Sequence, residues 1–158
     1  MPTGRFVVLR HDVGPQFQRA STAVASAAHL DWMFEHGDAL RTWSTDLPAA
    51  LQEKDCSGSQ FAWRDSFELP CQALQDHRIA YLTLEGDIGG GRGYVRRVLE
   101  GTYRTLSDLQ DRTEISIRWR QQGDDLSARL CIYRSRLSEE ERRLEESRLP
   151  LRLSFSTG

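Results

Sequence analysis

The sequence has few lysines and few cysteines, and each shortage narrows the class of protein. Its 158 residues include 21 lysines and arginines, of which only Lys54 is a lysine. The three cysteines, Cys56, Cys71 and Cys131, are odd in number and form no C-x-x-C pair, which argues against a disulfide framework or a thiolate zinc site. We therefore expect the cysteines to be reduced.

Long apolar runs are also lacking. No stretch is apolar for long enough to cross a bilayer, and the first residues, MPTGRFVVLRH, do not form a signal peptide. These absences predict a cytoplasmic protein without membrane contact. The formal net charge of −2 gives no general attraction to DNA, so nucleic-acid binding would require a local patch. The excess of arginine is typical of a GC-rich genome, although guanidinium groups also grip phosphate through two parallel hydrogen bonds.

The length and the composition, 39% hydrophobic and 28% charged, predict one globular domain over residues 1–158. Strand-like runs recur at 5–10, 29–36, 39–45, 67–74, 80–86, 93–101, 113–121 and 126–134. Turn residues separate several of them, as in DIGGGRG (87–93) and QGDD (122–125). This rhythm predicts a mainly β fold, and we favour a small antiparallel β-barrel over a sandwich.

Three segments depart from the strand rhythm. Residues 16–29 are rich in Ala and Ser and fit either a short helix or a flexible insertion, and residues 48–66 are predicted to form a loop. Ser138 as N-cap and Glu141 at the capping-box position predict a short C-terminal surface helix over 138–148. A last strand, LRLSFS, should follow it.

The run HLDWMFEH (29–36) predicts a strand with two unlike faces, because successive side chains alternate. Its apolar face holds Leu30, Trp32 and Phe34, and its opposite face holds His29, Asp31, Met33 and Glu35. A solvent-facing strand would explain the polar face, and so would a metal site.

Four histidines are present, His11, His29, His36 and His77. Neutral imidazoles with a carboxylate suit manganese, iron or zinc, and two histidines with one aspartate leave positions open for water and substrate. A lone strand histidine is more often a surface or hydrogen-bonded residue, and an H-x-D pair is common by chance. The residues alone leave the surface strand and the metal site both open. A third interpretation is a barrel whose histidines are scattered over its surface and never converge.

Six short motifs follow one another over roughly residues 5–134, namely RFVVLRH, HLDWMF, GDALRTW, DHRIAY, LEGDIGGGRG and GTYRT. In this order they resemble the 3′-phosphoesterase domain of bacterial DNA ligase D, the enzyme of non-homologous end joining. Leu30 replaces an aromatic residue of the family pattern, and an insertion separates His11 from His29. The resemblance implies a stand-alone, divergent member of that family with a barrel of antiparallel strands.

The resemblance also implies roles for individual residues. His11, Asp31 and His77 would hold a divalent metal, most plausibly manganese. His29 would contact the scissile phosphate or act as acid or base, and Tyr81 would assist at the phosphate with its hydroxyl. The implied activity is removal of a 3′-phosphate or 3′-ribonucleotide during DNA end repair, with DNA or RNA/DNA 3′ ends and end-joining proteins as partners.

Three positions depart from the family pattern. Met33 stands where the family has a phosphate-gripping arginine, Leu47 where it has a lysine, and Gln75 where it has an acid. Losing a bidentate arginine typically removes on the order of a few kcal/mol of transition-state stabilisation. Arg78 and Arg92 are candidates to compensate. The alternative prediction is a non-catalytic barrel that binds metal or nucleic acid without turnover.

Two further motifs have simpler interpretations. GDIGGGRG lacks the Lys-Ser/Thr of a phosphate-binding loop, so we predict a hairpin turn. Glu85 matches an acid of the family and would orient a ligand or a metal-bound water, or else be an ordinary surface carboxylate.

Overall fold

The computed structural model describes residues 1–15, 28–51, 63–135 and 151–158. Ten strands are present in these ranges: β1 (Thr3–Val13), β2 (Ala28–His36), β3 (Ala39–Asp46), β4 (Phe67–Ala73), β5 (His77–Arg78), β6 (Gly86–Asp87), β7 (Gly93–Leu109), β8 (Arg112–Gln121), β9 (Asp124–Arg134) and β10 (Leu151–Thr157). Within the same ranges the helical elements are two 3-10 turns, η1 (Ala49–Leu51) and η2 (Ile79–Leu82).

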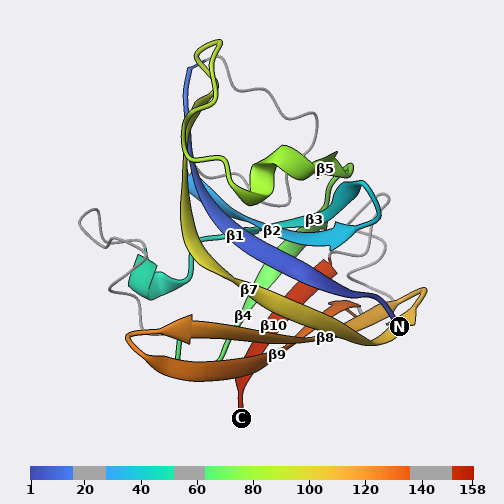
Figure 1. The fold of residues 1–158 in the computed structure, drawn as a ribbon. Coiled ribbons are helices and arrows are strands. Elements are labelled where there is room, and N and C mark those ends of the chain that lie inside the picture. Colours follow the sequence, from blue (N-terminus) through green and yellow to red (C-terminus); the bar gives the residue numbers. More distant parts are fainter. Residues whose placement is uncertain (16–27, 52–62, 136–150) are drawn as a thin grey trace.

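Eight of the strands close into an antiparallel barrel (Figure 1). Their order is β1-β2-β3-β4-β10-β9-β8-β7, and β7 pairs with β1 to complete the ring. Closure pairs both edges of each barrel strand, which removes the exposed edges that make open sheets prone to association. The predicted mainly β class and antiparallel barrel are confirmed.

Four segments predicted from the sequence lie wholly or mostly outside the described residues or differ from the structure. The helix predicted at 138–148 lies outside the described residues, as do most of the segments 16–29 and 48–66. The strand predicted at 80–86 is wrong, because residues 79–82 form η2. A strand would turn alternate side chains away from the sheet, whereas the 3-10 turn and the residues after it set Tyr81, Leu82 and Leu84 against the same apolar cluster.

The barrel interior is a packed core. The inward faces of the strands supply buried side chains that include Phe6, Val8, Leu30, Trp32, Phe34, Ile115, Ile117, Leu130, Leu153 and Phe155. Phe67 stacks on Phe155 with ring centroids 4.9 Å apart, and Trp32 meets Trp63 edge-on at 5.9 Å. Each fully buried side chain of this size contributes roughly 1.5–3 kcal/mol through the hydrophobic effect. The interior is therefore filled by side chains, so a binding or catalytic site has to lie on the outer surface of the barrel.

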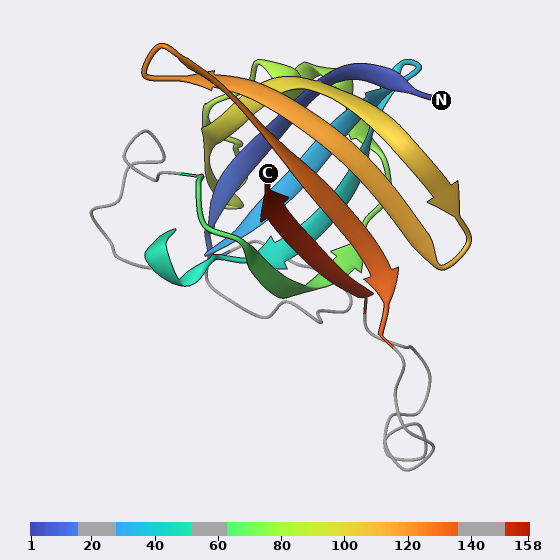
Figure 2. The same ribbon diagram turned by 90° about the horizontal axis from the view of Figure 1, so that it is seen from below.

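A second apolar cluster lies on the outer face of β1, β2 and β3. It comprises Val7, Leu9, Met33, Leu40, Leu82 and Val95, with Tyr81, Leu84 and Ile88 packed against it. Figure 1 shows η2 and its flanking residues above these strands, and Figure 2 shows β7, β8, β9 and β10 wrapping the rest of the barrel. We call residues 77–88 the cover segment. It shields an apolar patch that the strand alternation leaves outside the barrel.

Two cysteines of the described residues, Cys71 and Cys131, are free and buried. Among the described residues, no helix is both long and apolar enough to cross a membrane.

Candidate metal centre

His11, His29 and Asp31 come together on the outer face of the barrel. His11 of β1 lies directly opposite His29 of β2 in the antiparallel register, and Asp31 follows two residues later on the same face. The two imidazole rings meet edge-on with centroids 4.9 Å apart. One ligand atom from each of the three residues lies within 4.8 Å of the others. Two adjacent strands therefore present two nitrogens and one carboxylate oxygen to a common point.

The three side chains are almost fully buried, with 3%, 2% and 4% of the surface of His11, His29 and Asp31 exposed. His29 Nε2 lies 3.4 Å from Asp31 Oδ2. Leu9 is paired with Asp31 across the strands and Val95 with His11, so the group borders the apolar cluster under the cover segment. A buried carboxylate is costly unless it is paired, hydrogen-bonded or bound to a cation. The surroundings therefore strengthen any interaction between Asp31 and a positive charge.

A backbone carbonyl fixes the orientation of the His11 ring. His11 Nε2 lies 3.0 Å from the carbonyl oxygen of Arg92. A carbonyl oxygen only accepts, so Nε2 donates its proton, and in the neutral ring the lone pair is on Nδ1. Metal-binding histidines are commonly held in this way, with the non-ligating nitrogen donating to a carbonyl or carboxylate. The bond to Arg92 thus prepares His11 to bind through Nδ1.

The loop that carries this carbonyl depends on a glycine. The Arg92 carbonyl also accepts a hydrogen bond from the Gly14 amide at 3.0 Å, which ties the loop to the end of β1. Gly93 has φ +114°, and a Cβ there would lie 2.1 Å from the carbonyl oxygen of Asp12. The loop joins the paired strands β6 and β7, so the hairpin turn predicted from GDIGGGRG is confirmed. Its backbone, rather than any phosphate-binding motif, serves the site.

The donor set fits a divalent transition metal. Ligand bonds of about 2.0–2.2 Å would hold the ligand atoms roughly 3–4 Å apart, so small rotations of the side chains bring the group into range. Two imidazoles and one carboxylate suit manganese, iron or zinc and leave coordination positions for water or substrate. His11, His29 and Asp31 could therefore hold a metal ion.

His77, implied as the third ligand by the resemblance, is not in this group. It lies in β5, which pairs with β3 at Leu40, and its Nδ1 donates to the Gln75 carbonyl over 2.9 Å. His29 takes its place among the clustered residues, because the pairing of β1 with β2 sets it opposite His11. The role suggested for His29, contact with the scissile phosphate or acid–base action, stays a prediction, and the structure adds that His29 belongs to the group that could hold a metal.

His77 and Tyr81 form a second polar pair in the cover segment. Their rings meet edge-on with centroids 5.4 Å apart. Since Nδ1 of His77 donates to a carbonyl, Nε2 carries the lone pair in the neutral ring. Tyr81 is partly buried against the apolar cluster that borders Asp31. The cover segment thus places one imidazole and one phenol on the same outer face as the metal centre.

Two of the three positions that depart from the family pattern are buried, and the third is exposed. Met33 is 1% exposed and packs in the outer apolar cluster, and Leu47 is 7% exposed in the barrel core. Gln75 is exposed and accepts the hydrogen bond from His77 through its backbone. At positions 33 and 47 a charged side chain would have to be desolvated.

Two residues considered as helpers are engaged elsewhere. The Arg92 guanidinium donates to the carbonyls of Gly89 and Ile88, at 3.1 and 2.6 Å, within its own loop. Glu85 accepts a hydrogen bond from the Arg97 amide at 3.0 Å. Arg78 is exposed in β5.

The sequence patterns did not reveal that the Arg92 carbonyl contacts His11, because a backbone carbonyl is present at every position and no residue type marks this one.

No protein-family model matches the chain, and no curated protein matches its sequence. The case for function therefore depends on the residues and on their geometry.

Proposed function

We propose that this protein is a metal-dependent phosphoesterase-like barrel acting on 3′ ends of nucleic acid, related to the 3′-phosphoesterase domain of bacterial DNA ligase D. The observation that carries the proposal is the convergence of His11, His29 and Asp31 within 4.8 Å. The nucleic-acid substrate is proposed from the order of the sequence motifs. It would be a DNA end that carries a 3′-phosphate or a 3′-ribonucleotide. Its setting would be DNA end repair in the cytoplasm, together with end-joining proteins.

In this proposal His11, His29 and Asp31 hold the metal, with manganese favoured. A divalent ion at this position would polarise a phosphoryl oxygen and lower the pKa of a bound water. His11 binds through Nδ1 because its Nε2 proton is held by the Arg92 carbonyl. Asp31 supplies negative charge in a buried setting, where its attraction to a cation is little screened by water.

His77 and Tyr81 are proposed to serve the substrate rather than the metal. His77 Nε2 is suited to moving a proton at the leaving or attacking oxygen, since Nδ1 is occupied by the Gln75 carbonyl. The Tyr81 hydroxyl would donate to a phosphate oxygen. Their ring contact at 5.4 Å keeps the two groups in one place on the cover segment.

A specific observation favours a second candidate, a barrel that binds metal or nucleic acid without turnover. Met33 and Leu47 replace charged residues of the family pattern, and both are buried in apolar clusters. The phosphate would then be gripped by fewer charges, which weakens stabilisation of the transition state more than binding of the metal.

Metal binding is tested with single variants and a matched histidine control. Isothermal titration with Mn²⁺ and metal content by mass spectrometry should show binding in the wild type and in His36→Ala, whose histidine is exposed in the β2–β3 hairpin. His29→Ala and Asp31→Asn should lose binding, and His77→Ala should keep it. Equal, near-zero occupancy in all proteins after manganese loading would refute the metal centre.

Activity is tested separately with DNA primers ending in a 3′-phosphate or a single 3′-ribonucleotide. The wild type with Mn²⁺ should trim these ends, whereas His77→Ala and Tyr81→Phe should trim at least about tenfold more slowly while retaining metal. A protein that binds metal normally but trims no primer with any divalent ion would be the non-catalytic barrel.

A further inference from the structure

The outer face of β7, β8 and β9 carries a regular arrangement of arginines and hydroxyls. In the strand register, Thr102 lies opposite Arg118, and Arg118 opposite Ser127. In the neighbouring row Arg104 lies opposite Ser116, and Ser116 opposite Arg129. Each arginine thus has a hydroxyl beside it on the adjacent strand. We call these residues the arginine lattice, and its members are Thr102, Arg104, Ser116, Arg118, Ser127 and Arg129.

The three arginines of the lattice have no carboxylate partner in the described part of the chain. Arg104, Arg118 and Arg129 are exposed, and none of them forms an ion pair with a described residue. Seven arginines outside the lattice with exposed or partly exposed side chains each pair with a carboxylate, whereas Arg78, Arg120 and Arg134 form no ion pair with a described residue. The seven are Arg5, Arg41, Arg64, Arg96, Arg97, Arg112 and Arg152. Within the described ranges the lattice therefore concentrates positive charge that no ion pair offsets, in a protein whose net charge is −2.

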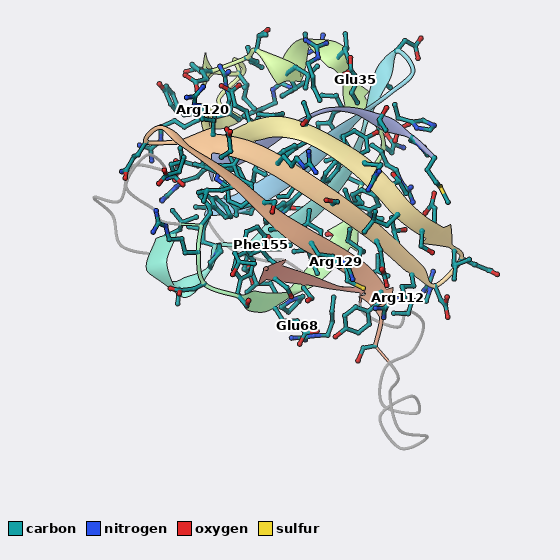
Figure 3. The ribbon with its side chains drawn as sticks, turned by 60° about the horizontal axis from the view of Figure 1, so that its bottom comes forward. Glu35, Glu68, Arg112, Arg120, Arg129 and Phe155 are labelled. Atoms are coloured by element: carbon teal, nitrogen blue, oxygen red, sulfur yellow. The ribbon has the colours of Figure 1, made fainter. Side chains whose placement is uncertain are left out.

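The lattice is bounded along the strands by residues that include carboxylates. At one end of β8, Arg112 donates to Glu114 at 2.7 Å, and at the other Arg120 lies opposite Asp125. Figure 3 labels Arg112 and Arg120 near these two ends, with Arg129 between them on β9. Carboxylates therefore stand at both ends of this sheet face, and its middle positions hold none among the described residues.

The spacing of the lattice suits a run of phosphates. Same-face neighbours lie about 6.6–6.8 Å apart along a strand and 4.7–4.9 Å apart across strands. Guanidinium groups grip phosphate bidentately, and Ser and Thr hydroxyls are frequent donors to the nucleic-acid backbone. Five residues, Thr102, Tyr103, Arg104, Ser116 and Arg118, also line a hollow of about 180 Å³ at the centre of this face.

We infer that the arginine lattice is a docking surface for the phosphodiester backbone of a nucleic acid. An acidic protein would offer charge as well, but protein interfaces usually centre on buried aromatic or apolar anchors. The six lattice residues are arginines and hydroxyls, and the one aromatic residue that lines the central hollow, Tyr103, is only 6% exposed. Phosphate recognition needs no such anchor, and charge complementarity therefore favours the nucleic acid.

This surface is distinct from the metal centre and does not depend on it. The link between them is β7, which pairs Val95 with His11 at one end and carries Thr102 and Arg104 farther along. A nucleic-acid backbone bound to the lattice would therefore contact β7, the strand that also borders the metal centre. The inference adds a substrate-holding surface to the proposed function, and it would also stand for a barrel that binds without turnover.

The test compares two triple variants that remove the same charge. Arg104→Gln/Arg118→Gln/Arg129→Gln empties the lattice, and Arg64→Gln/Arg134→Gln/Arg152→Gln removes three arginines from outside it. Binding to a fluorescein-labelled DNA duplex is measured by anisotropy over a range of salt concentrations, in EDTA so that no metal contributes. Circular dichroism melts check that both variants fold, and the single variant Arg118→Gln provides a milder perturbation.

The lattice variant should bind duplex about 10- to 100-fold more weakly at 0.1 M salt, and its log K against log[salt] slope should fall by about 2–3. Arg118→Gln should lower that slope by about 1. The control triple variant should stay within about twofold of the wild type. Equal losses in both triple variants, or none in the lattice variant, would overturn the inference. Polyglutamate competing as well as unlabelled duplex would point to an acidic partner and overturn it too.

Discussion

Adding one methyl group at Gly93 should loosen the candidate metal centre without changing any of its three residues. The Cβ of alanine would lie 2.1 Å from the Asp12 carbonyl oxygen and 2.6 Å from the Gly14 amide nitrogen. Both contacts are with backbone, so no side chain can rotate away. The loop must shift, and with it the Arg92 carbonyl that holds His11 and Gly14.

The magnitude follows from two contributions. A non-glycine residue held at φ +114° costs about 1–3 kcal/mol. Weakening the two hydrogen bonds to the Arg92 carbonyl adds about 1 kcal/mol or more. A total of about 2–4 kcal/mol corresponds to a fall in melting temperature of roughly 5–15 °C for a domain of this size. Loss of the contact that orients a ligand should lower Mn²⁺ affinity about 10- to 100-fold.

Gly89→Ala is the matched control in the same loop. Gly89 has φ +80°, but a Cβ there would meet nothing within 4 Å. Only the conformational cost of about 1–2 kcal/mol should appear, with Mn²⁺ affinity close to that of the wild type. The measurements are thermal melts without metal and isothermal titration with Mn²⁺. Equal melting temperatures for the two variants, or unchanged affinity in Gly93→Ala, would refute the role assigned to the loop.

Three further predictions concern the rest of the barrel. Hydrogen bonds from the Arg5 side chain and amide lower the pKa of Glu35 from 4.5 to about 2, so Glu35 stabilises the fold above pH 4.5 and that contribution is lost as the pH falls through 2. Urea unfolding between pH 6 and pH 2 should therefore show a shallower decline for Glu35→Gln, and parallel curves would contradict the pairing. Burial raises the pKa of the Cys71 thiol to about 12, so mass-spectrometric mapping should find Cys71 alkylated by iodoacetamide at pH 8 only after unfolding. Leu82→Ala should lower the free energy of unfolding by about 2–4 kcal/mol by opening the apolar cluster, whereas Ile79→Ala, 37% exposed, should change it by about 0.5 kcal/mol or less. Similar urea midpoints for these two variants would mean that the cover segment does not stabilise the barrel.

The alternation of side chains could be predicted from the sequence because it is a local property. HLDWMFEH has one face that can only be buried, and Leu30, Trp32 and Phe34 do fill the barrel interior. The turn residues between such strands indicated antiparallel neighbours, and hence a barrel. The segment 80–86 misled the same reasoning, since its apolar residues serve a patch outside the barrel rather than a strand face.

The residue types of the candidate metal centre, two histidines and an aspartate, could also be predicted, but not which histidines take part. Two histidines and an aspartate were expected, and the sequence supplied candidates from His11 to His77. Which histidine joins His11 depends on the register between β1 and β2, two strands that an insertion separates along the sequence. No local pattern encodes that register, because it follows from packing of the whole sheet.

By itself the sequence determined most of the strands, their buried faces and the chemical types available for a site, since these depend on neighbours two residues apart. Only the tertiary structure decided that His29 meets His11, that the Arg92 carbonyl orients that ring, and that arginines from three strands form one lattice. Each of these is a contact between distant segments, set by strand register and barrel closure, and the free energy that selects it is shared across the entire core.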